Sequence, residues 1–390
     1  MRNGKPFFIK GAGGFNQFKR LKEAGGNSIR IWEDHDAARI LDQAQALGLT
    51  VMFGLWVERD LDGFDYYDEE AVAKQFERIR KIIVKYRNHP ALLMWCVGNE
   101  WNLRAKNIGV YDEVNRIASM IHELDPHHPI TTAIGTTQAR TIWLIKDRCP
   151  AIDIISFNVY GALYQLSDVL KEADWTGPYM LSEFGTLGHW ESRVARWQAP
   201  IELPWQNKID FIKKNYLKYI GSQPPNCLGA YMFYWGNKEE GTHTWYSFFD
   251  AEGNETPFVE TMQQLWSGRL PKNLAPEVGK IEVDGIDSTY RSFPASATLH
   301  QARITASDPE KDSLSYYWEI RPQAALINQY DYMDVSLMPT EGLIASAKRP
   351  ETSFRLPSVA GQYRLFVYVY DGHKHVTSAN IPFLVGRRVQ

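Results

Sequence analysis

Two glutamates follow apolar runs, at places where a carboxylate is hard to accommodate. Glu100 follows the run 91–98, and Glu183 follows the run 178–182. Runs of this length, bounded by proline or glycine, are typical of strands buried on both faces. A carboxylate at the end of a buried strand is costly unless it is paired, hydrogen-bonded or catalytic. Enzymes that cleave a glycosidic bond generally use a pair of such carboxyl groups.

Cleavage with retention of configuration places geometric and electrostatic demands on such a pair. The two carboxyl groups must lie about 5 Å apart, one as nucleophile and the other as acid and base. Like charges at that distance cannot both ionise easily, so the pKa of one group rises and that group keeps its proton. The chemistry therefore predicts that two strands distant in the sequence meet at one cavity.

Strands and helices alternate from residue 6 to residue 266. Predicted strands cover residues 6–10, 28–32, 50–56, 91–98, 130–134, 152–160, 178–183 and 228–235. Predicted helices cover residues 15–24, 35–47, 69–87, 111–124, 138–146, 166–173, 205–220 and 257–266. Asp34 is the expected N-cap of the second helix. About 250 residues are typical of a (β/α)8 TIM barrel, so these pairs predict one, with the site at the carboxyl ends of its strands.

A doubly wound open sheet is the competing α/β architecture. It is disfavoured because Gly11-Ala-Gly-Gly14 lacks the third glycine of a GxGxxG phosphate loop. In the barrel, Glu100 on strand four and Glu183 on strand seven would face each other across the mouth.

The C-terminal part of the chain is built differently. Thirteen tryptophans occur, and only Trp318 lies after residue 270. Predicted strands cover residues 280–283, 296–306, 315–320, 353–356, 362–370 and 377–385. The fold class we predict is α/β: a barrel over residues 1–268, a linker over 269–277 and a small all-β, immunoglobulin-like sandwich over 278–390.

Two segments resemble the signature strands of the clan A glycoside hydrolases. They are Val97-Gly-Asn-Glu100-Trp-Asn102 and Met180-Leu-Ser-Glu183-Phe-Gly185. The nearest likeness is to the catalytic barrel of glycoside hydrolase family 2, which the opening segment 3–11 also resembles. This resemblance covers residues 1–266 and implies Glu100 as acid/base and Glu183 as nucleophile. The C-terminal region resembles polycystic-kidney-disease or cadherin-like modules, on residues 302–320 and 361–372.

The family resemblance also implies the residues around the glutamates. It gives Asn99 a contact with the sugar 2-hydroxyl, Arg30 and Tyr160 contacts with the nucleophile, and Trp235 the floor of the sugar site. Plain alternatives stay open: Asn99 as a turn residue, Arg30 as a surface ion-pair partner, and the two aromatics as packing.

Four further tryptophans are expected to present their rings to sugar. They are Trp56, Trp101, Trp190 and Trp245. The apolar CH faces of sugars stack on indoles, although each ring could equally belong to a core. Segment 186–204 is too long for a simple connection, and it and segment 235–245 are expected to form binding walls.

Composition and charge exclude several other classes. A net charge of −3 without a basic run disfavours nucleic acid as a partner. No apolar run reaches the roughly 20 residues of a membrane span. The cysteines Cys96, Cys149 and Cys227 are too scattered for a disulfide framework or zinc site. We expect no metal and no cofactor, because the acidic stretch 308–312 fits a turn better than a calcium loop.

The function predicted is a retaining β-glycoside hydrolase, or a transglycosylase, acting on a β-linked glucan or related oligo- or polysaccharide. The alternative is a non-catalytic carbohydrate-binding protein on a degenerate barrel. The sandwich domains that family 2 places before its barrel are missing from this sequence, which leaves exo-action and the sugar open. We expect a monomer or small homo-oligomer. Residues 1–5 are not a signal peptide, so the chain is either cytosolic or a mature form whose leader is missing, and we expect the periplasmic or secreted mature form.

Overall fold

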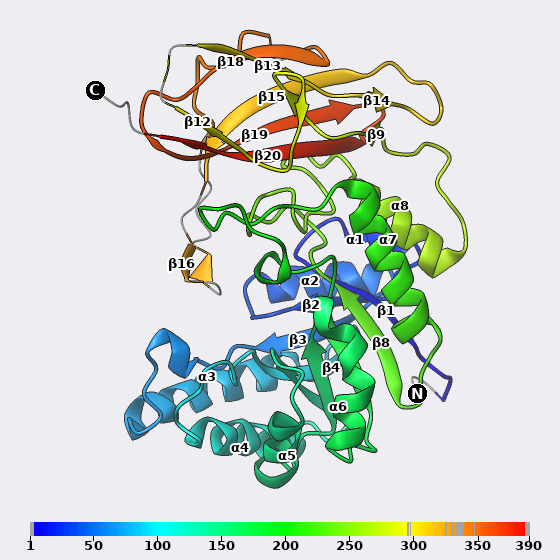
Figure 1. Ribbon diagram of the computed structural model, residues 1–390. Helices are drawn as coiled ribbons and strands as arrows, with labels where there is room; N and C mark the ends of the chain where they lie inside the picture. Colours follow the sequence, from blue (N-terminus) through cyan, green and yellow to red (C-terminus); the bar gives the residue numbers. More distant parts are fainter. Residues whose placement is uncertain are drawn as a thin grey trace. The chain divides into compact units, whose positions relative to one another are not determined.

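A computed structural model describes residues 4–294, 296, 298–323, 326–328, 331–332, 338–346 and 348–386 of the chain. By its internal contacts the chain divides into two compact units, which are described separately below (Figure 1). The first unit comprises Met1–Gly185 and Lys214–Trp235, and the second comprises Thr186–Lys213 and Gly236–Gln390. Segments 186–213 and 236–267, which follow or precede barrel strands in the sequence, thus share a unit with the C-terminal sheets.

The first unit contains a closed barrel of eight parallel strands in sequence order, which confirms the predicted fold class (Figure 1). Its strands are β1 (Ile9–Gly13), β2 (Ser28–Ile31), β3 (Thr50–Leu55), β4 (Leu92–Asn99), β5 (Ile130–Ile134), β6 (Ile154–Asn158), β7 (Tyr179–Phe184) and β8 (Cys227–Met232). Its helices are α1 (Phe18–Glu23), α2 (Ala37–Ala46), α3 (Glu69–Tyr86), α4 (Gly109–Leu124), α5 (Ala139–Arg148) and α6 (Leu166–Glu172). Among the described residues, no helix is long and apolar enough to cross a membrane.

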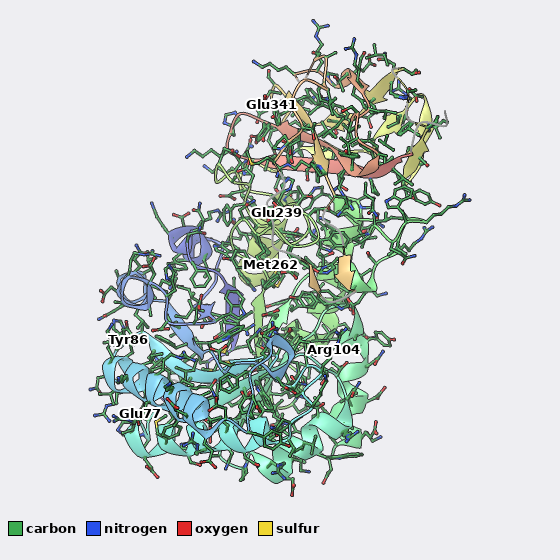
Figure 2. The ribbon with its side chains drawn as sticks, turned by 90° about the vertical axis from the view of Figure 1, so that its left-hand side faces the viewer. Glu77, Tyr86, Arg104, Glu239, Met262 and Glu341 are labelled. Carbon is green, nitrogen blue, oxygen red and sulfur yellow. The ribbon has the colours of Figure 1, made fainter. Side chains whose placement is uncertain are left out.

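Apolar side chains fill the barrel and hold its helices. One buried cluster takes residues from seven of the strands: Ile9, Met52, Met94, Cys96, Ala133, Ile154, Met180 and Tyr231. On α3, Tyr86 is buried with its ring 5.3 Å from that of Phe53 on β3, whereas Glu77 is exposed (Figure 2). This amphipathic pattern explains why a charged sequence still forms a barrel helix.

The start of α2 differs from the prediction. The helix begins at Ala37, and the residue at its N-cap position is Asp36, with a left-handed φ of 55° and no capping bond from its side chain. Asp34 lies one turn earlier, and its backbone oxygen accepts the N–H of Ala37 at 3.1 Å. The predicted cap at Asp34 is therefore wrong.

Two four-stranded sheets dominate the second unit, in the orders β11-β10-β13-β18 and β12-β20-β19-β15 (Figure 1). Their strands are β10 (Glu282–Val283), β11 (Ile286–Asp287), β12 (Arg291–Phe293), β13 (Leu299–Arg303), β15 (Ser315–Pro322), β18 (Glu351–Arg355), β19 (Gly361–Tyr370) and β20 (Val376–Val385). Smaller ladders pair β9 (Glu277–Val278) with β14 (Ala306–Ser307) and β16 (Leu326–Asn328) with β17 (Asp331–Tyr332). One buried cluster includes Trp318, Phe354 and Phe383 from both large sheets, so these pack face to face.

The second unit also contains two helices and a buried ion pair. Helix α7 (Trp205–Tyr216) begins in this unit and ends in the first, and α8 (Pro257–Ser267) lies wholly within it. The ammonium group of Lys208 pairs with the carboxylate of Glu202, and both side chains are almost fully buried. The same carboxylate accepts hydrogen bonds from Thr242 at 2.6 Å and from Asn380 of β20 at 2.7 Å. The pair therefore joins three separate stretches of the second unit.

Candidate active site

A tight turn after β4 places Glu100. Gly98 has a φ of 75°, and a Cβ there would lie 2.4 Å from a ring atom of Trp101, so only glycine fits. Glu100 itself is left-handed, with a φ of 51°. Its N–H donates to the backbone oxygen of Ala133 at 2.9 Å, which ties the turn to β5. Strain at a non-glycine residue is often held at functional positions.

Glu183 lies within β7 and is held at both oxygens. Its Oε1 accepts from Arg30 Nη1 at 2.8 Å and from Trp32 Nε1 at 2.9 Å. Its Oε2 accepts from the hydroxyl of Tyr160 at 2.9 Å. The side chain of Arg30 is 1% exposed, so this is a buried ion pair rather than a surface one. Three donors from the carboxyl ends of two other strands, β2 and β6, therefore fix the carboxylate in one orientation.

The side-chain amide of Asn158 links the residues around Glu100 to those around Glu183. Asn158 Nδ2 donates to Glu100 Oε1 at 2.9 Å and to Asn99 Oδ1 at 3.0 Å. Asn158 Oδ1 accepts from Ser182 Oγ at 2.7 Å and from Arg30 Nη1 at 3.3 Å. Because Arg30 also binds Glu183, both carboxyl groups belong to one hydrogen-bond network at the carboxyl end of the barrel.

The surroundings of Glu100 favour its protonated form. Burial and the nearby charge of Glu183 raise the pKa of Glu100 to about 7. The hydrogen bond from Asn158 and the positive charges of Arg30 and Arg59 act in the opposite direction. Glu100 can thus hold a proton near neutral pH, as a general acid must. A carboxyl group that keeps its proton beside a second carboxyl group is the pattern expected of a general acid.

Three of the predicted supporting residues come together with the glutamates. Arg30 Nη2 donates to Asn99 Oδ1 at 2.5 Å, besides binding Glu183, so its partners are site residues and not the surface carboxylates considered from the sequence. Tyr160 reaches Glu183 as the resemblance implied. The contact of Asn99 with a sugar hydroxyl stays a prediction, but the amide is held in place by Arg30 and Asn158.

The structure does not give Trp235, Trp101 or Trp245 an open ring face. Trp235 is 1% exposed, and its Nε1 donates to the backbone oxygen of Gln17 at 3.1 Å. Trp101 is 0% exposed, with its Nε1 on Thr132 Oγ1 at 2.7 Å. Trp245, in the second unit, is 1% exposed and packs beside His189. The expectation that these indoles stack on sugar is corrected, because their faces are covered by protein.

The two other predicted tryptophans keep open surface. Trp190 of the second unit is 40% exposed, with its ring edge-on to His189 at 4.8 Å. Trp56 of the first unit follows β3 directly and is half-buried. Both remain candidates for sugar contact.

Several site residues were missing from the sequence prediction. Trp32 lies two residues after Arg30, and Asn158 lies two residues before Tyr160. The period-2 rule for extended chain places each pair on one face and could have identified them. Ser182 bonds to Asn158, as described above. The ring of Phe233 lies edge-on to those of Trp32, at 5.9 Å, and Tyr160, at 6.1 Å. Tyr234 stacks on Trp32 at 5.8 Å, so both Phe233 and Tyr234 lie beside a residue that contacts Glu183.

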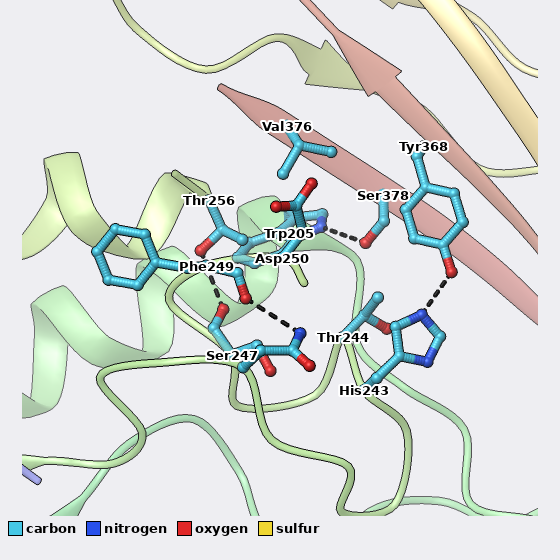
Figure 3. Close-up of a pocket in the computed structure, with 11 residues that line it drawn as sticks. Trp205, His243, Thr244, Ser247, Phe249, Asp250, Thr256, Tyr368, Val376 and Ser378 are labelled. Atoms are coloured by element: carbon cyan, nitrogen blue, oxygen red, sulfur yellow. Dashed lines mark hydrogen bonds between the residues drawn. The ribbon is translucent and has the colours of Figure 1, made fainter. Parts of the chain in front are cut away.

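Two polar features of the second unit belong to local structure. A small cavity near the start of α7 (Figure 3) is lined by side chains that bond to one another: Trp205 Nε1 donates to Ser378 Oγ at 3.3 Å, and His243 bonds to Tyr368. Carboxylate oxygens of Asp308, Asp312 and Asp371 lie within 4.8 Å of one another. Asp308 and Asp371 each accept backbone N–H groups of their own turns.

Comparisons with known proteins agree with the barrel. Residues 17–203 match the family model for the TIM barrel domain of glycosyl hydrolases family 2. A β-glucuronidase of Paenibacillus borealis is 26% identical over 215 residues, which are 47% of this chain and 34% of that protein. A β-galactosidase of Bacteroides ovatus is 31% identical over 177 residues, or 36% of this chain and 20% of that protein. The chain therefore covers a minor part of these relatives' length.

Solved structures show the same fold. The β-D-glucuronidase of Dictyoglomus thermophilum aligns with a TM-score of 0.52 and 22% identity, over 69% of this chain and 52% of that one. A β-glucuronidase of Bacteroides uniformis, bound covalently to a cyclophellitol-6-carboxylate aziridine, aligns with a TM-score of 0.52 and 16% identity. That alignment covers 99% of this chain and 47% of the other. None of these likenesses bears on the polycystic-kidney-disease or cadherin-like resemblance of the sandwich, which stays a prediction.

Proposed function

We propose that this chain, whose barrel matches the family 2 TIM barrel domain, is a retaining β-glycoside hydrolase. The observation that carries the proposal is the network around the two glutamates. Glu183 is fixed by Arg30, Trp32 and Tyr160, and Glu100 is set to hold a proton near neutral pH. A carbohydrate-binding protein without turnover has no need of a carboxyl group kept protonated beside an oriented carboxylate.

The reaction proceeds as a double displacement. The carboxylate of Glu183 attacks the anomeric carbon while Glu100 gives its proton to the departing glycosidic oxygen, so the C–O bond breaks and a glycosyl ester forms on Glu183. Glu100, now ionised, takes a proton from water, whose oxygen attacks the anomeric carbon and releases Glu183. Two inversions restore the β configuration. A sugar hydroxyl in place of water would make the reaction a transglycosylation.

The substrate we propose is a β-linked glucan or related oligo- or polysaccharide. The names of the relatives direct the first assays to β-glucuronides and β-galactosides, beside β-glucosides and β-mannosides. Because the chain covers less than two thirds of the length of those relatives, their substrates are used only to choose the set of sugars to be assayed.

A mechanism-based inactivator tests this proposal. Incubation with 2-deoxy-2-fluoro-β-glycosyl fluorides of these sugars should slow release of the glycosyl group and leave it bound to the enzyme. We expect the peptide that contains Glu183 to gain the mass of one fluorosugar, as found by digestion and mass spectrometry. Labelling at another residue, or turnover of β-glycosides that gives an α-configured first product, contradicts the mechanism.

The pH dependence of kcat/KM for a β-linked disaccharide should report Glu100. Because the acid must carry its proton, kcat/KM is expected to fall as pH rises through about 7, the pKa of Glu100. Asn158→Ala removes a hydrogen bond that lowers this pKa, so the fall should move to higher pH. Gln45→Ala, which removes an exposed amide on α2, serves as the control. A shift to lower pH in Asn158→Ala would be the opposite of this expectation.

A further inference from the structure

The loop after β3 lies next to the proposed acid. In the barrel Leu55 of β3 pairs with Val97 of β4. Trp56 is the next residue beyond this pair, and Glu100 lies three residues beyond it on the neighbouring strand. The indole of Trp56 is half-buried, and its Nε1 donates to Glu58 Oε2 at 3.2 Å. A partly open aromatic ring with a carboxylate beside it therefore stands on the Glu100 side of the site.

A positive charge accompanies this ring. The guanidinium carbon of Arg59 lies 5.7 Å from the centre of the Trp56 ring. Asp62 holds that guanidinium by two hydrogen bonds, of 2.7 and 3.0 Å. The charge of Arg59 is also one of those that act on Glu100. Trp56 and Arg59 thus share the environment of the acid.

The loop after β3 is tied to the loop after β4, in which Arg104 lies (Figure 2). Asp60 Oδ2 accepts the backbone N–H of Lys106 at 2.5 Å and that of Asn107 at 3.2 Å. From within the first loop, the hydroxyl of Tyr66 donates to the backbone oxygen of Glu58 at 2.5 Å. Arg78 of α3 donates to the backbone oxygen of Trp56 at 2.6 Å. These bonds hold residues 56–60, which we call the β3 rim, in a fixed shape.

A general acid must touch the departing oxygen, so the leaving group begins beside Glu100 and extends over neighbouring elements. We propose that the β3 rim is the binding site for this leaving group, and that the group is itself a sugar. Its apolar CH face stacks on the indole of Trp56, and its hydroxyl groups donate to Glu58. The inference rests on the proposed function and narrows it to β-linked disaccharides and longer chains.

The experiment compares two substrates that differ only in the leaving group. Cellobiose or lactose places a sugar on the β3 rim, whereas the matched β-glucosyl or β-galactosyl fluoride releases fluoride and places nothing there. For Trp56→Ala, the ratio of kcat/KM for the disaccharide to that for the fluoride should fall about tenfold, since a stacking platform is lost. Trp56→Phe, which keeps a smaller ring, should recover part of this ratio.

A second pair of variants changes Asp60 and Asp65, two residues that are not proposed to contact the sugar. Asp60→Asn weakens the bonds to Lys106 and Asn107 and should lower the same ratio severalfold. Asp65 accepts the N–H of Tyr67 at 2.8 Å but does not join the two loops, so Asp65→Asn is the matched control. Circular dichroism melting of each variant establishes that it is folded.

The possible outcomes distinguish a failure of the subsite proposal from a failure of the proposed enzymatic activity. An equal loss on both substrates in Trp56→Ala, or a ratio like that of the unmodified chain, rejects the subsite and leaves the proposed function standing. If the unmodified chain releases sugar from neither type of substrate across the panel, the proposed function and the subsite are both rejected.

Discussion

Replacing Glu183 by Gln is expected to lower kcat by about 10⁴-fold or more, because an amide cannot attack the anomeric carbon. The fold should survive this change. The amide oxygen can still accept from Arg30 and Trp32, which bind Oε1 of the glutamate at 2.8 and 2.9 Å. Steady-state kinetics on the preferred glycosyl fluoride, with circular dichroism as a check on folding, measures the effect.

Glu172→Gln on α6 is the matched control, since that glutamate is exposed and ends a helix instead of a barrel strand. It should behave as the unmodified chain. If Glu183→Gln keeps more than about one hundredth of the original kcat, the nucleophile is another group, because removal of a true nucleophile costs far more.

Replacing Glu100 by Gln should lower kcat/KM by a factor that depends on the leaving group of the substrate. General acid catalysis contributes about 10²–10⁴-fold, so kcat/KM for a β-linked disaccharide should fall by roughly 10³-fold. For a glycosyl fluoride the fall should be much smaller, because fluoride departs with less help from a proton. The decline of kcat/KM above about pH 7 should also disappear, since Glu100 is the group that titrates there.

A pH profile for both substrates in Glu100→Gln measures these effects together. An equal loss on disaccharide and fluoride, with the decline at high pH still present, assigns the acid to a different residue. Exchanged roles for Glu100 and Glu183 would show as leaving-group dependence in Glu183→Gln instead.

The barrel could be predicted from the sequence because its strands are mostly apolar runs of four to eight residues separated by helical patterns. The placement of Glu100 and Glu183 at the same end of the barrel followed from the order of the strands, because parallel strands have all their carboxyl ends at one end of the barrel. The family resemblance implied the contact of Arg30 with the nucleophile, and an arginine among apolar neighbours needs a buried partner. The structure supplies that partner, Glu183.

The residue at which β8 ends could not be predicted from the sequence. Residues 231–235 are all aromatic or apolar, so no alternation marks where the strand stops. The strand ends at Met232, and the rings of Phe233 and Tyr234, rather than Trp235, lie against Trp32. Contacts such as that between Glu202 and Asn380, 178 positions apart, carry no local signal at all. The sequence therefore predicted a barrel and a sandwich, but not that segments 186–213 and 236–267 share a unit with the C-terminal sheets.

The buried pair of Glu202 and Lys208 has a consequence for any attempt to shorten the protein. Cutting the chain after α8 would remove Asn380, one of the donors that make an interior carboxylate tolerable, and Arg364 of β19, which donates to the backbone oxygen of Pro200 at 2.7 Å. What remains would be an ion pair newly exposed to water, with Glu202 just before α7 and Lys208 within it. Within the second unit, the segment Thr186–Lys213 therefore depends on β19 and β20 for part of its interior.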